Sequence, residues 1–219
     1  MSMEEQLETP PERDPREDWL SVTQILKLAG LSPWVDIDLD LLRRGVELGL
    51  DERRLRYLLN GIDPEILERK RERGVNVHMA IADIEHGLDE AWWAGESWEP
   101  YVIAYQRFKA ETKYTASLIE HRVYNESYQY RGDLDSLGML DGKVEALIDV
   151  KTTVQMDPTI AFQLSGYAGA LPPNPKRLRL GLQLMKDGTY KIHEYKSRND
   201  NAIFLAALTL ARVKEGLRS

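Results

Sequence analysis

The segment from Arg131 to Thr153 constrains the fold of this 219-residue chain more than any other, because it has the pattern of a β-hairpin. Two strand-forming runs flank the turn signal Asp141-Gly142. In the second run, 144–151, side chains alternate between two faces, as a period of two requires. Asp149 and Lys151 therefore share one face, and the sequence predicts a carboxylate beside an ammonium group.

Two further carboxylates, those of Asp133 and Asp135, lie on the partner strand of this hairpin. Carboxylates from adjacent strands can hold a hard divalent cation such as Mg²⁺ through oxygen ligands. A neighbouring lysine can orient or deprotonate a water, or neutralise charge as a phosphodiester is attacked. The alternative is a surface hairpin with an ion pair worth at most about 1 kcal/mol. Because Asp-x-Lys tripeptides are common, the hairpin alone favours that alternative.

Four short motifs in a fixed order favour the metal site over the surface ion pair. Together they resemble the core of the PD-(D/E)XK nucleases, and specifically their RecB-like, phage-type exonuclease branch. The resemblance covers the chain from about Val22 to Leu171. In chain order the motifs are Gly74-x-x-x-His78, Gly132-x-x-Asp135, Asp149-x-Lys151-Thr-Thr and Gln163-x-x-x-Tyr167.

The resemblance implies a restriction-endonuclease-like α/β fold, a mixed β-sheet with an antiparallel meander flanked by helices. It also implies a DNA nuclease that depends on one or two Mg²⁺ or Mn²⁺ ions. By the same resemblance, the enzyme is expected to be an exonuclease of phage-type recombination or DNA processing. Its partner would be the end of single- or double-stranded DNA, with a recombination protein as a candidate second partner and the oligomeric state left open.

The resemblance also assigns roles to individual residues. It makes Asp135, Asp149 and His78 metal ligands, and it makes Lys151 the catalytic residue that positions or activates the attacking water. Glu120 matches a strand glutamate that reaches the metal region, as a ligand or a water-positioning group. This catalytic role is favoured over a cross-strand pair with Arg122 or Lys151. Asp133 is the reserve candidate for the role of Asp135. Gln163 and Tyr167 lie at i and i+4, so both can face one groove and contact nucleic acid; the alternative is a helix that packs its small residues on the sheet.

The hairpin connection decides whether such a metal site is possible. A two-residue turn at Asp141-Gly142 would place Asp135 opposite Ile148, and a one-residue difference in register moves a side chain to the other face. Joint binding of metal by Asp135 and Asp149 therefore predicts a three-residue connection, with Leu140 opposite Val144, or a bulge near Gly138.

Charge does not favour a general nucleic-acid binder. The net charge is −7, although basic residues cluster at 43–44, 53–56 and 69–73. A non-catalytic or partner-dependent nucleic-acid-binding module on a nuclease fold is therefore the alternative function. The absence of cysteine excludes disulfides and thiolate metal sites. With no long apolar run and no signal-peptide pattern, we expect a cytoplasmic protein without a membrane partner.

The expected organisation is a flexible arm over 1–18 and a single nuclease-like domain over 19–219. Within the domain, Trp92, Trp93 and Trp98 suggest either stacking on exposed bases or packing against the sheet, and the second is favoured. The patterns predict helices over 19–29, 39–49, 51–60, 64–73, 75–87, 100–113, 159–171 and 199–217. They predict strands over 118–124, 128–137, 144–151, 177–184 and 190–195.

Overall fold

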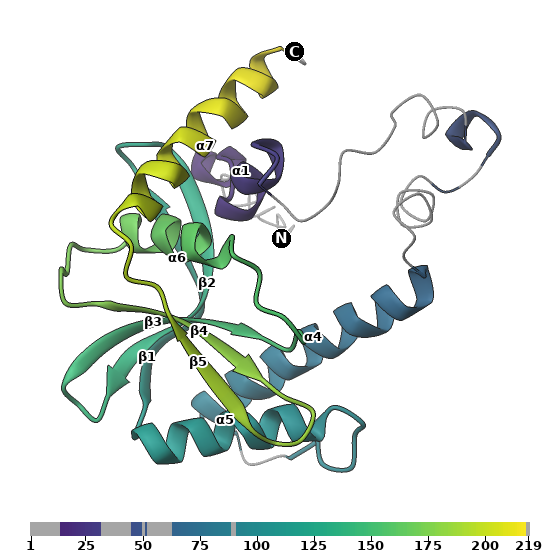
Figure 1. Ribbon diagram of the computed structural model, residues 1–219, viewed down its shortest axis with the longest axis vertical. Coiled ribbons are helices and arrows are strands. Elements are labelled where there is room, and N and C mark those ends of the chain that lie inside the picture. The colour runs from purple at the N-terminus through teal and green to yellow at the C-terminus, as the bar shows by residue number, and fades with distance from the viewer. Residues whose placement is uncertain (1–13, 32–44, 50, 52–62, 89–90, 218–219) are drawn as a thin grey trace, which may run out of the picture.

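A five-stranded mixed sheet forms the centre of the protein, in the strand order β1-β2-β3-β4-β5 (Figure 1). The first three strands pair antiparallel, β3 and β4 pair parallel, and β5 returns antiparallel beside β4. This confirms the expected mixed α/β architecture with an antiparallel meander. The strands are β1 Thr115–Asn125, β2 Tyr130–Leu140, β3 Val144–Lys151, β4 Leu178–Leu184 and β5 Tyr190–Glu194.

The computed structural model describes residues 14–31, 45–49, 51, 63–88 and 91–217. The helices expected over 39–49 and 51–60 fall mainly outside these residues, as do the basic clusters at 43–44 and 53–56. Among the described helices, none is both long and apolar enough to cross a membrane.

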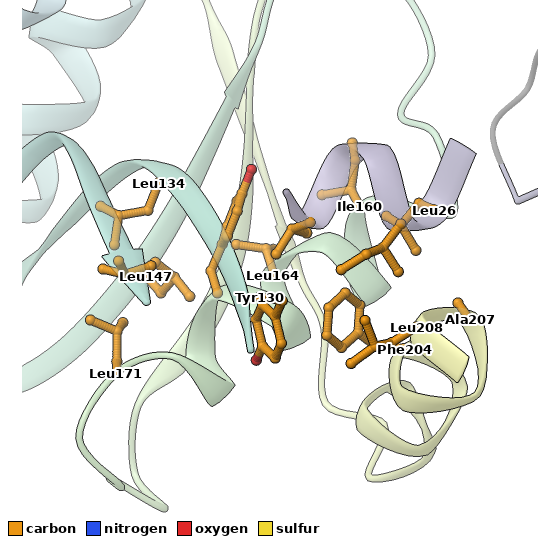
Figure 2. Packing of buried hydrophobic residues seen from close by; sticks show 14 of the residues in the cluster. Leu26, Tyr130, Leu134, Leu147, Ile160, Leu164, Leu171, Phe204, Ala207 and Leu208 are labelled. Atoms are coloured by element: carbon orange, nitrogen blue, oxygen red, sulfur yellow. The ribbon is translucent and has the colours of Figure 1, made fainter. Parts of the chain in front are cut away.

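Helices cover both faces of the sheet, as Figure 1 shows, with α1, α6 and α7 on one side and α4 and α5 on the other. Each layer buries its own apolar cluster against the strands. Figure 2 shows the first cluster, in which the rings of Tyr130 and Phe204 meet edge to face, 5.1 Å apart. The helices are α1 Val22–Leu28, α4 Pro64–Glu85, α5 Glu99–Thr112, α6 Ile160–Gly169 and α7 Asn199–Gly216.

Local signals set several of these boundaries. Ser21 caps α1 through a reciprocal pair of hydrogen bonds with Gln24. The helices expected over 64–73 and 75–87 are one continuous helix, α4. A glycine such as Gly74 costs an exposed helix only about 1 kcal/mol. Burial of Val77 and Ile81 in the second cluster outweighs that cost.

The folded part of the chain extends into the predicted arm. Pro15–Asp18 form a short 3₁₀ helix, η1, whose Glu17 carboxylate accepts a hydrogen bond from the Tyr124 hydroxyl at 2.6 Å. Arg122 forms an ion pair with the same carboxylate. Polar contacts to β1 therefore order residues that composition alone assigns to a flexible segment.

Of the three tryptophans at 92, 93 and 98, Trp98 is buried in the second cluster and Trp93 packs against it. Trp92 is 42% exposed, and its indole nitrogen donates to Asp83 Oδ2 at 2.8 Å. The preferred packing interpretation therefore holds for Trp93 and Trp98.

The connection between β2 and β3 has the register that a shared metal site requires. Leu140 pairs with Val144, so the loop has three residues, and the pairing of β2 with β3 ends at Ser136 with Ile148. Continuing this register one step places Asp135 opposite Asp149, on the same face of the sheet. Asp141 and Gly142 both have positive φ, which lets the chain reverse within this short loop.

Candidate functional site

The candidate site lies where β2 separates from β3, beyond the pair Ser136–Ile148. Past this point Val150 N donates to the side chain of Asp135, at 2.6 Å from Oδ2, in place of a β2 carbonyl. The carbonyl oxygen of Val150 lies 3.2 Å from His78 Nε2. Two side chains thus satisfy the backbone groups that the opening of the ladder leaves unpaired. These bonds fix both Asp135 and His78 against one residue of β3.

Three possible metal ligands converge at this opening, each from a different element. His78 of α4 donates from Nδ1 to Glu120 Oε1 at 2.8 Å, and its Nε2 is 3.9 Å from Asp135 Oδ2. Among the described residues, the ligand atoms of His78, Glu120 and Asp135 all lie within 4.8 Å of one another. A mixed set of imidazole and carboxylate ligands is suitable for a divalent cation such as Mn²⁺.

The backbone of Glu120 is held in the left-handed region, with φ of +43°. Such a conformation costs a residue other than glycine on the order of 1–3 kcal/mol and tends to occur at functional sites. It lies between two residues of β1 that pair normally with β2, Ile119 and His121. This local irregularity accompanies the approach of the Glu120 carboxylate to His78.

The carboxylates around His78 favour a positive charge at this position. Burial lowers the pKa of His78, but the Asp135 and Glu120 carboxylates outweigh burial and raise that pKa to about 9. The imidazole is therefore protonated at neutral pH and places its own positive charge between the two carboxylates. Binding of a metal ion would replace this proton, because ligation requires the neutral imidazole.

Asp149 is the most unusual charged group in the described part of the chain, because it is completely buried. Lys151 Nζ is 2.7 Å from Asp149 Oδ2, yet neither carboxylate oxygen accepts a hydrogen bond of acceptable geometry from a described residue. Burial raises the pKa of Asp149 to about 6; Lys151 opposes this rise and Asp135 adds to it. An unsatisfied buried carboxylate close to other carboxylates fits a site that a cation completes.

Lys151 has the complementary environment. Burial lowers the pKa of its ammonium group, but Asp149 and Asp135 outweigh burial and raise that pKa. Its side chain is 28% exposed, and its ammonium group contacts Asp149. The predicted carboxylate–ammonium pair on one face of β3 is therefore present in the structure.

The expected ligand set and the observed group overlap in part. His78 and Asp135 lie together as expected, and Glu120 joins them. Asp149 turns its carboxylate toward Lys151 and is not among the described ligand atoms within 4.8 Å of one another. The reserve candidate Asp133 is instead half exposed and pairs with Arg122 and Arg131 at 2.6 and 3.4 Å.

Gln163 and Tyr167 contact each other on α6, and they differ in exposure. Tyr167 is 3% exposed, and its hydroxyl accepts a hydrogen bond from Gln163 Nε2 at 2.8 Å. Burial raises the pKa of Tyr167 well above its usual value, and the charges of Asp135 and Asp149 add to this rise. The tyrosine ring therefore belongs to the core beside the site, while Gln163 remains partly exposed.

Gly132 explains how two of the sequence motifs depend on each other. A Cβ at this position would lie 2.6 and 2.8 Å from ring carbons Cδ1 and Cε1 of Tyr167.

Gly132→Ala should therefore lower the free energy of unfolding by about 1–3 kcal/mol, the usual cost of overpacking a core. Urea denaturation measures this cost. Gly74→Ala is the control, because nothing lies within 4 Å of a Cβ there; equal stabilities of the two variants would contradict the prediction.

Some contacts of the site have no signal in the sequence. Arg73 Nη2 donates to the carbonyl oxygen of Thr152 at 3.0 Å, across 79 positions of the chain. The role of the Val150 backbone is equally invisible, because it arises only when β2 leaves β3. Both contacts depend on long-range packing and not on a local pattern.

Comparison with known proteins adds little. No family model matches the chain, and no curated protein matches it. A solved structure titled "Crystal structure of SSO0001" has a TM-score of 0.44 and 12% sequence identity, over 95% of this chain and 79% of that one. Similarity at this level identifies no function for the chain.

Proposed function

We propose that this chain is a divalent-metal-dependent DNA nuclease on a restriction-endonuclease-like fold, acting as an exonuclease in phage-type recombination or DNA processing. The observation that carries the proposal is the convergence of His78, Glu120 and Asp135 within 4.8 Å, at the strand opening next to the Asp149–Lys151 pair. Hydrolysis of a phosphodiester needs such a combination of anionic ligands and a cationic side chain.

His78, Asp135 and Glu120 would hold the ion, Mg²⁺ or Mn²⁺, and Asp149 would complete its surroundings or bind a second one. When bound, the ion supplies Lewis acidity and stabilises the charge that develops on the phosphate oxygens. The buried oxygens of Asp149 support this assignment, because they accept no hydrogen bond from a described residue and Lys151 is the one cation paired with them among those residues. A buried carboxylate with so few partners is costly unless further positive charge compensates it.

Lys151 is the side chain that we propose contacts the reacting phosphate or the attacking water. Its ammonium group is held at 2.7 Å from Asp149 on a side chain that is 28% exposed. There it would donate a hydrogen bond to the attacking water or to a phosphate oxygen. Gln163, held by Tyr167, is the side chain of α6 that can contact the DNA strand. His78 and Asp135 keep β3 in place through the Val150 backbone.

Degradation of end-labelled DNA by the purified chain tests the proposal. Linear and circular substrates, single- and double-stranded, are incubated with Mg²⁺, Mn²⁺ or EDTA, and Lys151→Ala is assayed in parallel. We expect loss of linear DNA only, dependent on metal and at least about 100-fold slower in the variant. Thermal unfolding of Lys151→Ala must show that the variant is folded, since it leaves Asp149 without its cation.

One observation favours the alternative of a non-catalytic or partner-dependent binding module. The net charge of −7 is unusual for a protein that engages DNA alone. Binding of DNA without cleavage in either metal would support that alternative, and cleavage by the isolated chain would rule it out.

A further inference from the structure

A hollow of about 570 Å³ lies between the first part of α4, the start of α5 and the turn between β4 and β5. We call it the α4 groove. Four basic side chains line it, and only two acidic ones, Glu72 and Glu96, accompany them. The basic residues are Arg69, Lys70 and Arg73 of α4 and Lys186 of the turn. The groove is thus basic in a chain whose net charge is −7.

The basic groups on the rim of the groove are available to a ligand. Within the described part of the chain, no carboxylate lies within 4.0 Å of the ammonium groups of Lys70 or Lys186, and both side chains are exposed. Arg69 donates from Nε to the carbonyl oxygen of Glu65 at 3.3 Å, which leaves its terminal nitrogens free of ion pairs with described residues. Cations that lack internal partners are suited to an external anion.

Arg73 connects the groove to the candidate site. Its guanidinium lies over the ring of Tyr101, 4.9 Å from the ring centroid, and its Nη2 donates to the Thr152 carbonyl next to Lys151. Its Nε is buried without a hydrogen-bond partner among the described residues. Packing therefore fixes this arginine at the point where the groove meets the end of β3.

The spacing along α4 corresponds to a few nucleotides. Arg73 precedes His78 by five residues and Lys70 precedes it by eight, which is about 7.5 and 12 Å along a helix axis. Successive nucleotides of a B-form strand advance about 3.4 Å. The groove therefore lies about two to four nucleotides from the candidate ligands. Figure 1 shows that α4 continues past the sheet in this direction.

From these observations we infer that the α4 groove binds the sugar–phosphate backbone of the DNA strand whose scissile bond lies at the candidate site. This inference deepens the proposed nuclease function and rests on it for the identity of the strand. Rows of basic groups recognise the regularly spaced phosphates of a nucleic acid independently of its sequence. Arg73 orients the strand end, and Lys70 and Lys186 neutralise the phosphates farther from the cleavage point.

Binding of a labelled single-stranded 12-mer oligodeoxynucleotide to the full chain tests the inference. Fluorescence anisotropy is measured in EDTA, where binding is separated from any cleavage. The test variant is Lys70→Glu/Lys186→Glu. The control is Lys143→Glu/Lys176→Glu, which makes the same charge change at two exposed lysines near the other end of β3. Thermal unfolding confirms that both variants are folded.

We expect the test variant to bind at least about 25-fold more weakly than the control at 0.1 M salt. Each lost phosphate contact of a single strand lowers the slope of log K against log salt by about 0.7, so two contacts lower it by about 1.4. Oligodeoxynucleotides of one or two nucleotides should not distinguish the variants, because they are too short to reach from the site to the groove.

Equal affinities of the two variants, or no binding by the unaltered chain at low salt, would overturn the inference. Displacement of the oligodeoxynucleotide by poly-glutamate of equal charge, as effectively as by unlabelled DNA, would also overturn it and indicate a general anion surface. The two proposals fail separately. Loss of binding in the test variant without metal-dependent cleavage by the unaltered chain retains the groove and rejects the nuclease. Metal-dependent cleavage by the unaltered chain, together with equal affinities of the test and control variants, retains the nuclease and rejects the groove.

Discussion

Asp135→Asn is expected to lower metal-dependent DNA cleavage by about 10²- to 10³-fold while leaving the protein folded. The asparagine side-chain oxygen can still accept the hydrogen bond from Val150 N that Asp135 Oδ2 accepts at 2.6 Å. The negative charge is lost, however, and with it the carboxylate that faces His78. The substitution therefore separates the structural role of this side chain from its role as a ligand.

Stabilisation by metal gives a second measurement of the same change. At a Mn²⁺ concentration 100 times the dissociation constant, an ion that binds only the folded state adds about 2.7 kcal/mol to the free energy of unfolding. Urea denaturation with and without Mn²⁺ should show this gain for the unaltered chain and little of it for Asp135→Asn.

Asp133→Asn is the matched control for this prediction. It makes the same chemical change two positions away, at a half-exposed side chain that pairs with Arg122. An exposed ion pair of this kind contributes about 0–1 kcal/mol, so both cleavage and stabilisation by metal should persist. If instead Asp133→Asn abolished cleavage and Asp135→Asn did not, the assignment of the metal ligand would be wrong.

Asp149→Asn should abolish cleavage and at the same time stabilise the metal-free protein above pH 7. The buried Asp149 carboxyl has a pKa of about 6, against 3.8 for an unperturbed aspartate. The folded state therefore holds this proton more tightly than the unfolded state does. Asp149 in its neutral form favours folding at low pH, and that contribution is lost as the pH rises from about 4 through 6.

The size of this loss follows from the shift. Each pKa unit corresponds to about 1.36 kcal/mol, so the loss is on the order of a few kcal/mol, and most of it falls between pH 4.5 and 7. Asparagine is neutral at every pH and lacks this contribution. The stability of Asp149→Asn relative to the unaltered chain should therefore increase over that interval and then level off.

Urea denaturation in EDTA at several pH values measures the difference, and the subtraction removes groups that titrate alike in both proteins. Two parallel curves would contradict the prediction, because they would mean that Asp149 is charged at no cost. A protein that gains stability when it loses a carboxylate of the candidate site would follow the common trade between stability and function.

Local sequence patterns were enough to predict much of the scaffold. The strand β3 has the predicted bounds, Val144–Lys151. The alternation of side chains also predicted that Asp149 and Lys151 share a face, since this follows from a period of two. The continuity of α4 through Gly74 could not be predicted in this way, because burial of its apolar face outweighs a small local penalty.

The register of the hairpin was only partly predictable from the sequence. The sequence contained a turn signal that fits two- and three-residue connections alike, and only the requirement for a shared face favoured the longer one. The pairing of Leu140 with Val144 confirms it. A difference of one residue in the loop costs little locally, but it reverses every side chain on the strand, so packing of the whole sheet selects the register.

By itself, the sequence determined the elements, the side chains that share a strand face, and the order of the candidate ligands along the chain. These properties depend on backbone geometry over a few residues. Only the tertiary structure decided that β2 leaves β3 at Asp135, that His78 and Glu120 meet across 42 positions, and that Lys186 joins the α4 groove. Such contacts depend on how helices pack on a sheet, and that packing is fixed by burial over the whole domain.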